Sequence, residues 1–269
     1  MTRNPAHRSS DNARGGRLPH IPTLGSTCRL IREDLGLSRF GAQQRHGISP
    51  SYLFNIEKDE YTPTFETLEK IIAGYGLNPM QARHLRELRT PAEELAPTDK
   101  LRQCVNENVD LVSHLDDLEQ REVLAAYLDP LWNVLGRNDL FRAATPGLEE
   151  TDCIPVWLFT PQAKTAFVQW DHESAYSVAT LKATLGRYRD SEQAKNVIRQ
   201  LRPVKEVRQQ WSSSIDVAYG RDTNDLLHLR DPATGELASY RLTVADVTQT
   251  QNVLLLTAIR KPYSGPEPS

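Results

Sequence analysis

The feature that most constrains this chain is the segment 23–89, in which short amphipathic stretches alternate with residues that begin or end helices. Gly47 follows one such stretch, at the position where a glycine in the left-handed conformation ends a helix. Ser38 stands where a helix N-cap would, and Ser49 precedes Pro50, which suits the first helical position. The apolar residues recur at helical spacing and do not alternate as in a strand. The segment therefore predicts four or five short helices and no sheet.

Four of these helices can be delimited. The first covers 24–35 and is ended by Gly36, the second runs over 38–46, and the third over 49–58. The fourth opens at 62–64 and ends at Gly76. Its apolar residues fall at i, i+3, i+4 and i+7, the spacing of one helix face: Leu68, Ile71, Ile72 and Tyr75.

The second and third helices are joined by a short turn that contains glycine, the arrangement of a helix-turn-helix. An α-helix is about 10–12 Å wide and fits the major groove of B-DNA. At about 100° per residue, Leu53 and Ile56 of the third helix face inward, with Glu57 at the edge. The opposite face is polar and carries Ser51, Asn55 and Lys58.

These three polar side chains suit a DNA groove. Asn55 can make a bidentate contact to adenine, Ser51 can bond a base or a phosphate, and Lys58 can neutralise a phosphate. The same residue types on a surface helix are more often only a solvated face. Periodicity alone therefore leaves both interpretations open.

The longer stretch LGLSRFGAQQRHGISPSYLFNIEKDEYTPTFETLEKIIAGYGL resembles the helix-turn-helix of the XRE, or lambda-repressor-like, family. The shared motifs are Leu37-Ser38, Gly47-Ile48-Ser49, Ile56-Glu57, Pro63 and Gly76-Leu77. The resemblance implies a sequence-specific transcriptional regulator that binds double-stranded DNA, and paired half-sites predict a homodimer. We expect Ser51 and Asn55 to contact bases. We expect the DNA phosphates to be contacted by Arg39, Arg45, Lys58 and Thr62. The whole predicted DNA-binding set is Arg39, Arg45, Pro50, Ser51, Tyr52, Asn55, Lys58 and Thr62.

One departure from the family lies at Arg39-Phe40-Gly41, where a glutamine and a polar pair are common. Gly41 weakens the second helix by about 1 kcal/mol relative to alanine. Phe40 suits either a core or a protein partner. An alternative therefore stays open: a protein-interaction or adaptor module that uses this fold as a scaffold, with Phe40 and Tyr52 facing the partner. Salt-sensitive duplex binding separates the two.

Beyond residue 98 the pattern changes. An apolar stripe over 101–118, formed by Val105, Val109, Val112 and Leu115, predicts a connecting helix. Strands are predicted over 123–127, 132–135, 225–230, 236–247 and 253–260, and helices over 138–144, 161–167, 173–188 and 192–211, the last broken near Pro203. This order predicts an α+β domain with an antiparallel sheet.

Three stretches of this part, LDPLWNVLGRNDLFRAATPG, VWLFTPQAKTAFVQWDHESAYSVATLKATLGRYRD and LLLTAIRKP, resemble the MmyB-like ligand-binding domain that follows such helix-turn-helix domains. The resemblance implies a PAS-like fold and a pocket for a small apolar, fatty-acid-like ligand, with no other cofactor. Large aromatic side chains that can line such a pocket, or equally fill a core, lie within forty residues: Trp132, Phe141, Trp157, Phe159, Phe167 and Trp170.

The domain division follows from these patterns. It comprises a disordered basic arm (1–22), the helix-turn-helix domain (23–92), a linker with the connecting helix (93–118), the MmyB-like domain (119–262) and a disordered tail (263–269). The net charge of −3 is uneven, because the first 92 residues carry +4 and the remainder −7. Affinity for a polyanion is therefore expected at the N-terminal side, with the arginines of the arm adding nonspecific attraction.

An enzyme is not expected. Asp171-His172-Glu173 is the one cluster typical of catalysis or metal binding, but adjacent residues on a helix splay by about 100° and cannot converge on one metal. Asp171 as an N-cap, with Glu173 in the first turn, explains the cluster. The sequence has no GxSxG elbow, phosphate loop or dinucleotide motif.

The cellular setting follows from three further absences in the sequence. Cys28, Cys104 and Cys153 are far apart, without zinc spacing, and predict reduced thiols. The first 22 residues lack the apolar stretch of a signal peptide, and no run reaches the roughly 18–20 apolar residues of a membrane span. The sequence predicts a cytoplasmic protein that does not cross a membrane.

Overall fold

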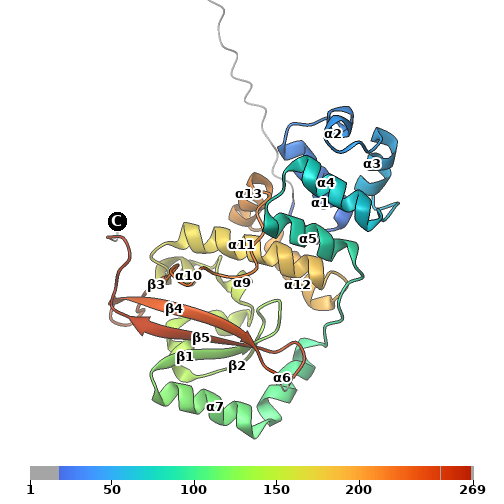
Figure 1. Cartoon of the computed structure of the whole chain (residues 1–269). Coiled ribbons are helices and arrows are strands. Elements are labelled where there is room, and N and C mark those ends of the chain that lie inside the picture. The colour runs from blue at the N-terminus through green and yellow to red at the C-terminus, as the bar shows by residue number, and fades with distance from the viewer. Residues whose placement is uncertain (1–17, 249, 268–269) are drawn as a thin grey trace, which may run out of the picture.

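The computed structural model describes residues 18–248 and 250–267 (Figure 1). A bundle of helices forms one end of the molecule, and a sheet with its covering helices forms the rest. The expected fold class, an all-α helix-turn-helix domain followed by an α+β domain with an antiparallel sheet, is confirmed. The arm predicted over 1–22 lies outside the described residues up to position 17, and the predicted tail lies outside them at 268–269.

The bundle follows the helix signals of the sequence. Its helices are α1 (Leu24–Asp34), α2 (Arg39–His46), α3 (Pro50–Glu57), α4 (Phe65–Tyr75) and α5 (Pro79–Arg89). Ser38 and Ser49 are N-caps whose hydroxyls accept a backbone N–H, and Gly47 ends α2 at φ 72° in the left-handed region. The fifth helix begins with a capping box at Asn78. Fully buried side chains from α1, α3, α4 and α5 form the core of the bundle: Cys28, Leu53, Ile56, Leu68, Ile71 and Leu85.

The sheet of the second part has five strands, all paired antiparallel, in the order β2-β1-β5-β4-β3. The strands are β1 (Val123–Leu128), β2 (Val134–Arg137), β3 (Leu227–Arg230), β4 (Leu237–Asp246) and β5 (Leu254–Lys261). The first and last strands in sequence order lie side by side at the centre, which is why the two ends of this domain must both be present for the sheet to form.

Each face of the sheet packs on a different set of helices. One face meets α8 (Asp139–Ala144), the 3-10 turn η1 (Leu148–Glu150), α9 (Ile154–Trp157) and α10 (Pro161–Ala166), with Leu128, Phe141 and Trp157 in the core. The other face meets α6 (Thr98–Glu107) and α7 (Val109–Gln120), with Val105, Leu115 and Tyr127 between them.

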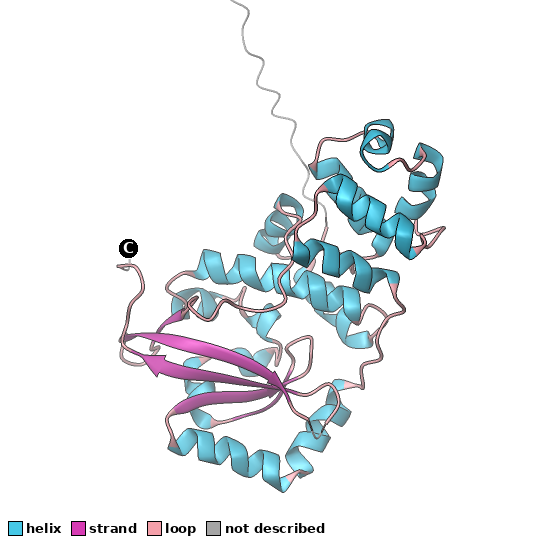
Figure 2. Ribbon diagram, in the orientation of Figure 1, coloured by secondary structure: helices cyan, strands magenta, loops and turns pink. Residues whose placement is uncertain are grey.

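A third layer lies between the sheet and the bundle (Figure 2). It consists of α11 (Trp170–Arg187), α12 (Glu192–Leu201) and α13 (Lys205–Ser213), and the predicted break near Pro203 is confirmed. Its apolar core is formed by Leu158, Leu181, Leu185, Val197, Leu201 and Trp211.

The connecting helix predicted over 101–118 is wrong. Two helices, α6 and α7, meet at Asn108, whose backbone is extended and whose side chain accepts the N–H groups of Asp110 and Leu111. The break rotates the apolar stripe, so that Leu115 is buried whereas Val109 is 74% exposed. A local N-cap therefore overrides the continuous periodicity.

Two boundaries also differ from the prediction. The strand β2 begins at Val134 and not at Trp132, because the carboxylate of Asp129 accepts the N–H groups of Leu131 and Asn133 and holds the intervening residues in a turn. Trp132 lies in that turn at φ 66°. Helix α11 begins at Trp170, so that Asp171 is inside the helix and is not its N-cap.

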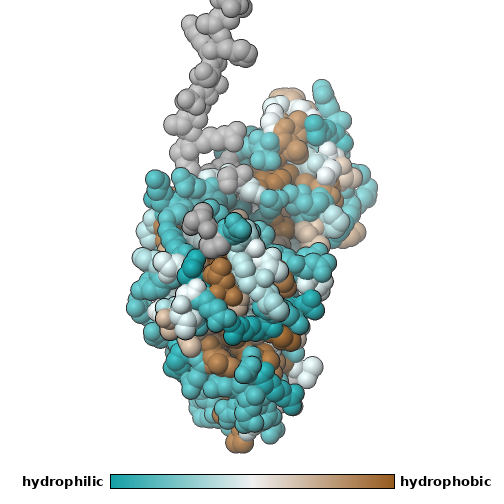
Figure 3. Space-filling view, turned by 90° about the vertical axis from the view of Figure 1, so that its left-hand side faces the viewer, coloured by the Kyte–Doolittle hydropathy of each residue, from teal (hydrophilic) through white to brown (hydrophobic). Residues whose placement is uncertain are grey.

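The bundle docks directly on the helical layer, because α5 packs against α11. The hydroxyl of Tyr219 donates to Glu87 Oε2 at 2.6 Å, and Arg187 Nε lies 2.7 Å from Glu93 Oε1. Residues 18–22, which the sequence assigns to the arm, belong to this junction: Ile21 packs against the core of the helical layer and His20 against the Trp211 ring. Figure 3 shows the bundle as a lobe set off from a larger body, and no described helix is long and apolar enough to span a membrane.

Candidate nucleic-acid interface

The helix-turn-helix lies at the end of the bundle away from the second domain. Figure 1 shows α2 and α3 at the outer end, whereas α5 faces the helical layer. The domain junction therefore leaves α2 and α3 uncovered.

The inner face of α3 is fixed by packing. Leu53 and Ile56 have no exposed surface, as the helical wheel predicts. On the outer face Ser51 is exposed and Asn55 half-buried, and neither side chain forms a hydrogen bond with any described residue. Lys58, at the C-cap of α3, is exposed. The helix thus presents unpaired polar groups on a rigid support.

Glu57 is a buried anchor and not an edge residue. Only 1% of its side chain is exposed, and it accepts hydrogen bonds from two arginines. Arg32 of α1 reaches Oε1 with Nε at 2.5 Å and Oε2 with Nη2 at 3.0 Å. Arg39 of α2 reaches Oε2 with Nε at 2.9 Å and Nη2 at 2.8 Å. The carboxylate therefore ties three helices together and fixes the angle at which α3 is presented.

Arg39, predicted to contact a phosphate, is partly committed to this cluster. Its side chain is 31% exposed, and its guanidinium lies 4.9 Å from the ring centroid of Phe54. The Lys58 ammonium lies 5.8 Å from the same ring. Phe54, which sequence reasoning missed, is 40% exposed and holds two cationic groups beside α3. The sequence did contain a signal for this role. Phe54 directly precedes Asn55 in a helix whose other large apolar residues face inward.

The remaining predicted DNA-binding residues occupy the rim of the motif. Arg45 and Thr62 are exposed, and Pro50 is the first residue of α3. Tyr52 is half-buried, with its ring 6.2 Å from that of Tyr61. Phe40 is 73% exposed at the start of α2, so it does not belong to the core.

His46 supports the turn before α3. Its Nδ1 accepts the backbone N–H of Ile48 at 3.1 Å, and its ring packs edge-on against Tyr75. Burial lowers the pKa of His46. The neutral ring is the form that can accept this bond, so the turn depends on an uncharged histidine.

The six aromatics predicted for a ligand pocket fall into two adjoining apolar cores of the second domain, which share Phe167. We call these six side chains the aromatic layer. Trp157 is 1% exposed and its indole N–H donates to the Pro146 carbonyl, while Trp170 donates to the Leu158 carbonyl. Ring pairs join Trp157 with Phe167 at 5.7 Å and Phe159 with Trp170 at 5.8 Å. Phe141 is buried and Trp132 half-buried against the same sheet face.

Two small cavities lie elsewhere in the described part of the chain, and neither is lined by these six aromatics. One, of about 110 Å³, lies over β3 and β4 beside Ala144 and is edged by Arg230 and Arg260. The other, of about 30 Å³, lies at the junction of the two domains. Pockets for drug-sized ligands measure roughly 300–1,000 Å³, which is larger than either cavity.

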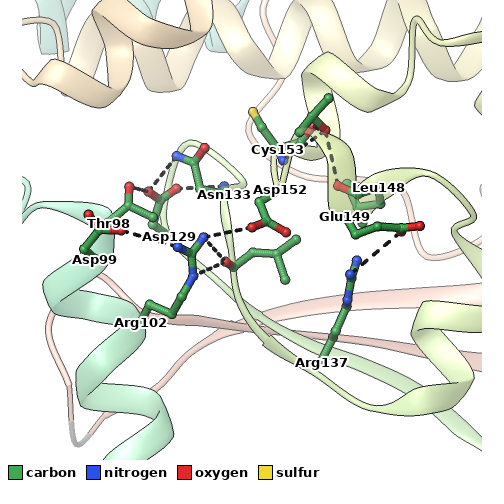
Figure 4. A network of polar contacts seen from close by, with 12 residues as sticks. Thr98, Asp99, Arg102, Asp129, Asn133, Arg137, Leu148, Glu149, Asp152 and Cys153 are labelled. Carbon is green, nitrogen blue, oxygen red and sulfur yellow. Dashed lines mark hydrogen bonds and ion pairs between the residues drawn. The ribbon is translucent and has the colours of Figure 1, made fainter.

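A polar network borders the aromatic layer (Figure 4). Arg102 of α6 donates to the Val134 carbonyl and to Asp152, and Asp129 accepts from Thr98. Burial raises the pKa of Asp129, and four hydrogen bonds to the carboxylate offset part of this desolvation. The network fastens α6 to the β1–β2 turn and to the loop before α9.

Arg137 lies in the same region but is only weakly paired. Its side chain is 8% exposed, and its Nη2 lies a loose 3.9 Å from Glu149 Oε2. Its Nη1 is buried without a hydrogen-bond partner among the described residues. Arg137 is registered opposite Ala126, whose side chain belongs to the core that holds Phe141 and Trp157. A cationic donor therefore borders the aromatic layer.

The cluster Asp171-His172-Glu173 diverges as predicted for adjacent helical residues. Glu173 binds Arg221 with both oxygens, at 2.6 and 2.7 Å, and this pair is buried. His172 instead faces Asp225 at 3.2 Å on the surface. The Glu173–Arg221 pair fastens α11 to the segment before β3.

Two family models match different parts of the chain. Residues 112–264 match the family model described as MmyB-like transcription regulator ligand binding domain, and residues 29–80 match the model described as helix-turn-helix. A segment of 55 residues is 33% identical to the immunity repressor protein of Bacillus phage phi105. That match covers 20% of this chain and 38% of the repressor.

Proposed function

Because this chain belongs to the family that carries the MmyB-like transcription regulator ligand binding domain, we propose that it is a DNA-binding regulator whose α3 reads specific operator sequences under the control of a small ligand. The observation that carries the proposal is the contrast on α3. Its inner residues and Glu57 are fixed, while Ser51 and Asn55 present unpaired polar groups outward.

The proposed readout divides the contacts by type. Asn55 bonds N6 and N7 of an adenine, and Ser51 bonds a base or the adjacent phosphate. Arg45, Lys58 and Thr62 contact phosphates around the groove. Arg39 keeps Nη1 for a phosphate while its other nitrogens hold Glu57.

We propose that two copies bind together. One such domain contacts a short half-site, and two-fold pairing on half-sites about 10–10.5 base pairs apart supplies specificity. Sedimentation of the protein with and without an operator duplex tests this, since a 1:1 complex at saturating protein contradicts it.

The proposed ligand is a small apolar molecule with an acidic head group, such as a fatty acid. The aromatic layer supplies apolar walls once it opens, and Arg137 offers a buried guanidinium N–H that has no partner among the described residues. Since α11 packs both on this domain and on α5, rearrangement of the layer can reach the DNA-binding bundle.

The test is competition binding with a labelled fragment from upstream of the protein's own gene. Wild type is expected to retain the fragment against unrelated duplex, and Asn55→Ala is expected to lose this preference. Asn106→Ala, an exposed helical asparagine on α6, is the matched control and keeps it. Equal loss in both variants, or no preference in wild type, contradicts the proposal.

A second candidate function is favoured by Phe40, which is 73% exposed beside the predicted DNA contacts. In a protein-interaction or adaptor module, Phe40 and Tyr52 contact a protein partner instead of DNA. Duplex affinity separates the two functions, because phosphate contacts make it fall steeply with salt. Binding that is absent at low salt favours the adaptor.

A further inference from the structure

The junction of the two domains contains an unusually close helix contact. At Gly186 of α11 an added Cβ would lie 2.8 Å from His84 Cε1 and 2.9 Å from Leu88 Cδ2, both on α5. The absence of a side chain at Gly186 is therefore what lets α5 reach α11. One turn earlier on α11, Lys182 points into the same junction.

Lys182 is a buried cation with no carboxylate partner among the described residues. It is 5% exposed, and of its three ammonium protons one is used in the bond to the Ser214 carbonyl at 2.6 Å. Within the described residues no carboxylate lies within ion-pair distance of its Nζ, and Asp216 acts only from farther away. The face of Trp211, 5.4 Å from Nζ, offsets part of the desolvation. Burying a charge without an ionic partner costs free energy, so this ammonium group indicates a site for a bound counter-ion.

His84 adds a second unsatisfied group. It is 3% exposed, and its Nδ1 has no hydrogen-bond partner among the residues described. Burial and the nearby Lys182 lower the pKa of His84 to about 4, and burial lowers that of Lys182 to about 8. At neutral pH the junction therefore holds one ammonium and one neutral imidazole.

Both groups line the cavity of about 30 Å³ between the domains. Its other walls come from the N-terminal segment, α1, α13 and the segment after α13, and include Thr27, Ile31 and Trp211. The walls are largely apolar and the volume suits one small group. A monovalent anion fits this combination of a buried positive charge, an apolar wall and a small volume.

We infer that this cavity is a binding site for a small monovalent anion, a halide or a carboxylate the size of formate, held by the Lys182 ammonium. The hydroxyl of Thr27 and the imidazole of His84 can donate to the same anion. Because α11 supplies Lys182 and α5 supplies His84, an occupied site stabilises the docked arrangement of the two domains. Its effect on operator binding rests on the proposed function, whereas anion binding does not.

The experiment is thermal unfolding of the full chain in sodium chloride, sodium formate or sodium gluconate at equal ionic strength. Gluconate is too large for the cavity and serves as the salt control. Tm is expected to rise to a plateau with chloride and with formate, and not with gluconate. The plateau is expected to vanish in Lys182→Met and to persist in Lys195→Met, an exposed lysine of α12. Equal curves for all three salts, or a plateau that survives Lys182→Met, overturn the inference.

The same titrations distinguish a halide from a carboxylate as the bound anion. The concentrations of chloride and of formate that give half of the maximal shift in Tm are compared. If Lys182→Met does not fold, wild-type crystals soaked in bromide are used, and no anomalous peak beside Lys182 Nζ overturns the inference. The titratable groups at or near the cavity are His20, His84, Asp216 and Lys182. Because burial lowers the pKa of Lys182 to about 8, the shift in Tm is expected to disappear as the pH rises through about 8. Asn55→Ala leaves the shift unchanged, which separates this site from DNA reading.

Discussion

Arg32 and Glu57 join the first and third helices through a buried ion pair, with Arg32 Nε 2.5 Å from Glu57 Oε1 and 8% and 1% of the two side chains exposed. Arg39 completes the cluster from the second helix. The orientation of the proposed recognition helix therefore depends on one carboxylate shared by two guanidinium groups.

Replacing this carboxylate is expected to destabilise the bundle strongly. Glu57→Ala removes the buried partner of Arg32 and leaves it the Leu37 carbonyl and a 3.6 Å contact with Glu33, which costs about 3–5 kcal/mol. The free energy of unfolding from urea titration measures the loss. Glu66→Ala, which removes an exposed i,i+4 pair with Lys70, is the control and leaves the midpoint unchanged. A similar small change for Glu57→Ala would contradict the anchoring role.

Asn138 is expected to be the most sensitive asparagine of the second domain. Its Oδ1 accepts the N–H groups of Ala125 and Phe141, and its Nδ2 donates to the Val123 carbonyl. Asn138→Ala removes a helix cap and leaves buried backbone groups unpaired, at a cost of about 2–4 kcal/mol. Calorimetry of the variant against Asn106→Ala tests this, and equal transition temperatures are the opposing outcome.

The pH dependence of stability follows from His84. Its pKa is about 4 in the fold and ordinary in the unfolded chain, so the unfolded state binds the proton first on acidification. The stability associated with neutral His84 is present above pH 6.5 and is lost progressively as the pH falls toward 4, by roughly 3 kcal/mol in total. Unfolding free energies between pH 4 and 7 are expected to flatten in His84→Leu and not in His114→Gln, an exposed control. An unchanged slope in His84→Leu contradicts this.

Gly186→Ala is expected to loosen the domain junction, because the new Cβ meets the rigid ring of His84. Overpacking of this kind costs about 1–3 kcal/mol. Hydrogen exchange is expected to speed up in α5 while the sheet stays protected. Gly220→Ala, where no atom lies within 4 Å, is the control. Unchanged exchange in α5 would show that the junction tolerates the side chain.

The proposed ligand chemistry predicts a role for Arg137. Dodecanoate is expected to bind more tightly than dodecanol in wild type, and Arg137→Met is expected to abolish the difference, because only the carboxylate pairs with the guanidinium. Titration calorimetry measures both ligands. Equal preference for dodecanoate in wild type and variant places the acidic head elsewhere.

Local chemistry made the bundle predictable from sequence. The caps Ser38, Ser49 and Gly47 act within a few residues, so the sequence contains all the information that sets α2 and α3. The strands of the antiparallel sheet were also predictable from local sequence. The strand order was not, because β1 pairs with β5 across most of the domain.

Contacts between distant residues set the limits of prediction. Glu57 stands at the edge of a helical wheel, and only the arginines of two other helices reveal that it is buried. Asn108 could have been taken as an N-cap, but the continuous apolar stripe favoured one helix. Lys182 and His84 have no local signature, because their burial arises only when the two domains dock.

The most direct test of the central claim is a double-mutant cycle between Asn55 and one adenine of the operator. The adenine is replaced by 7-deazaadenine, which lacks the N7 acceptor, and affinities of wild type and Asn55→Ala are measured by fluorescence anisotropy at fixed salt. A direct bidentate contact predicts a coupling energy of about 1–3 kcal/mol at one position, with no further loss when both changes are combined. Strictly additive losses at every adenine would contradict base reading by α3.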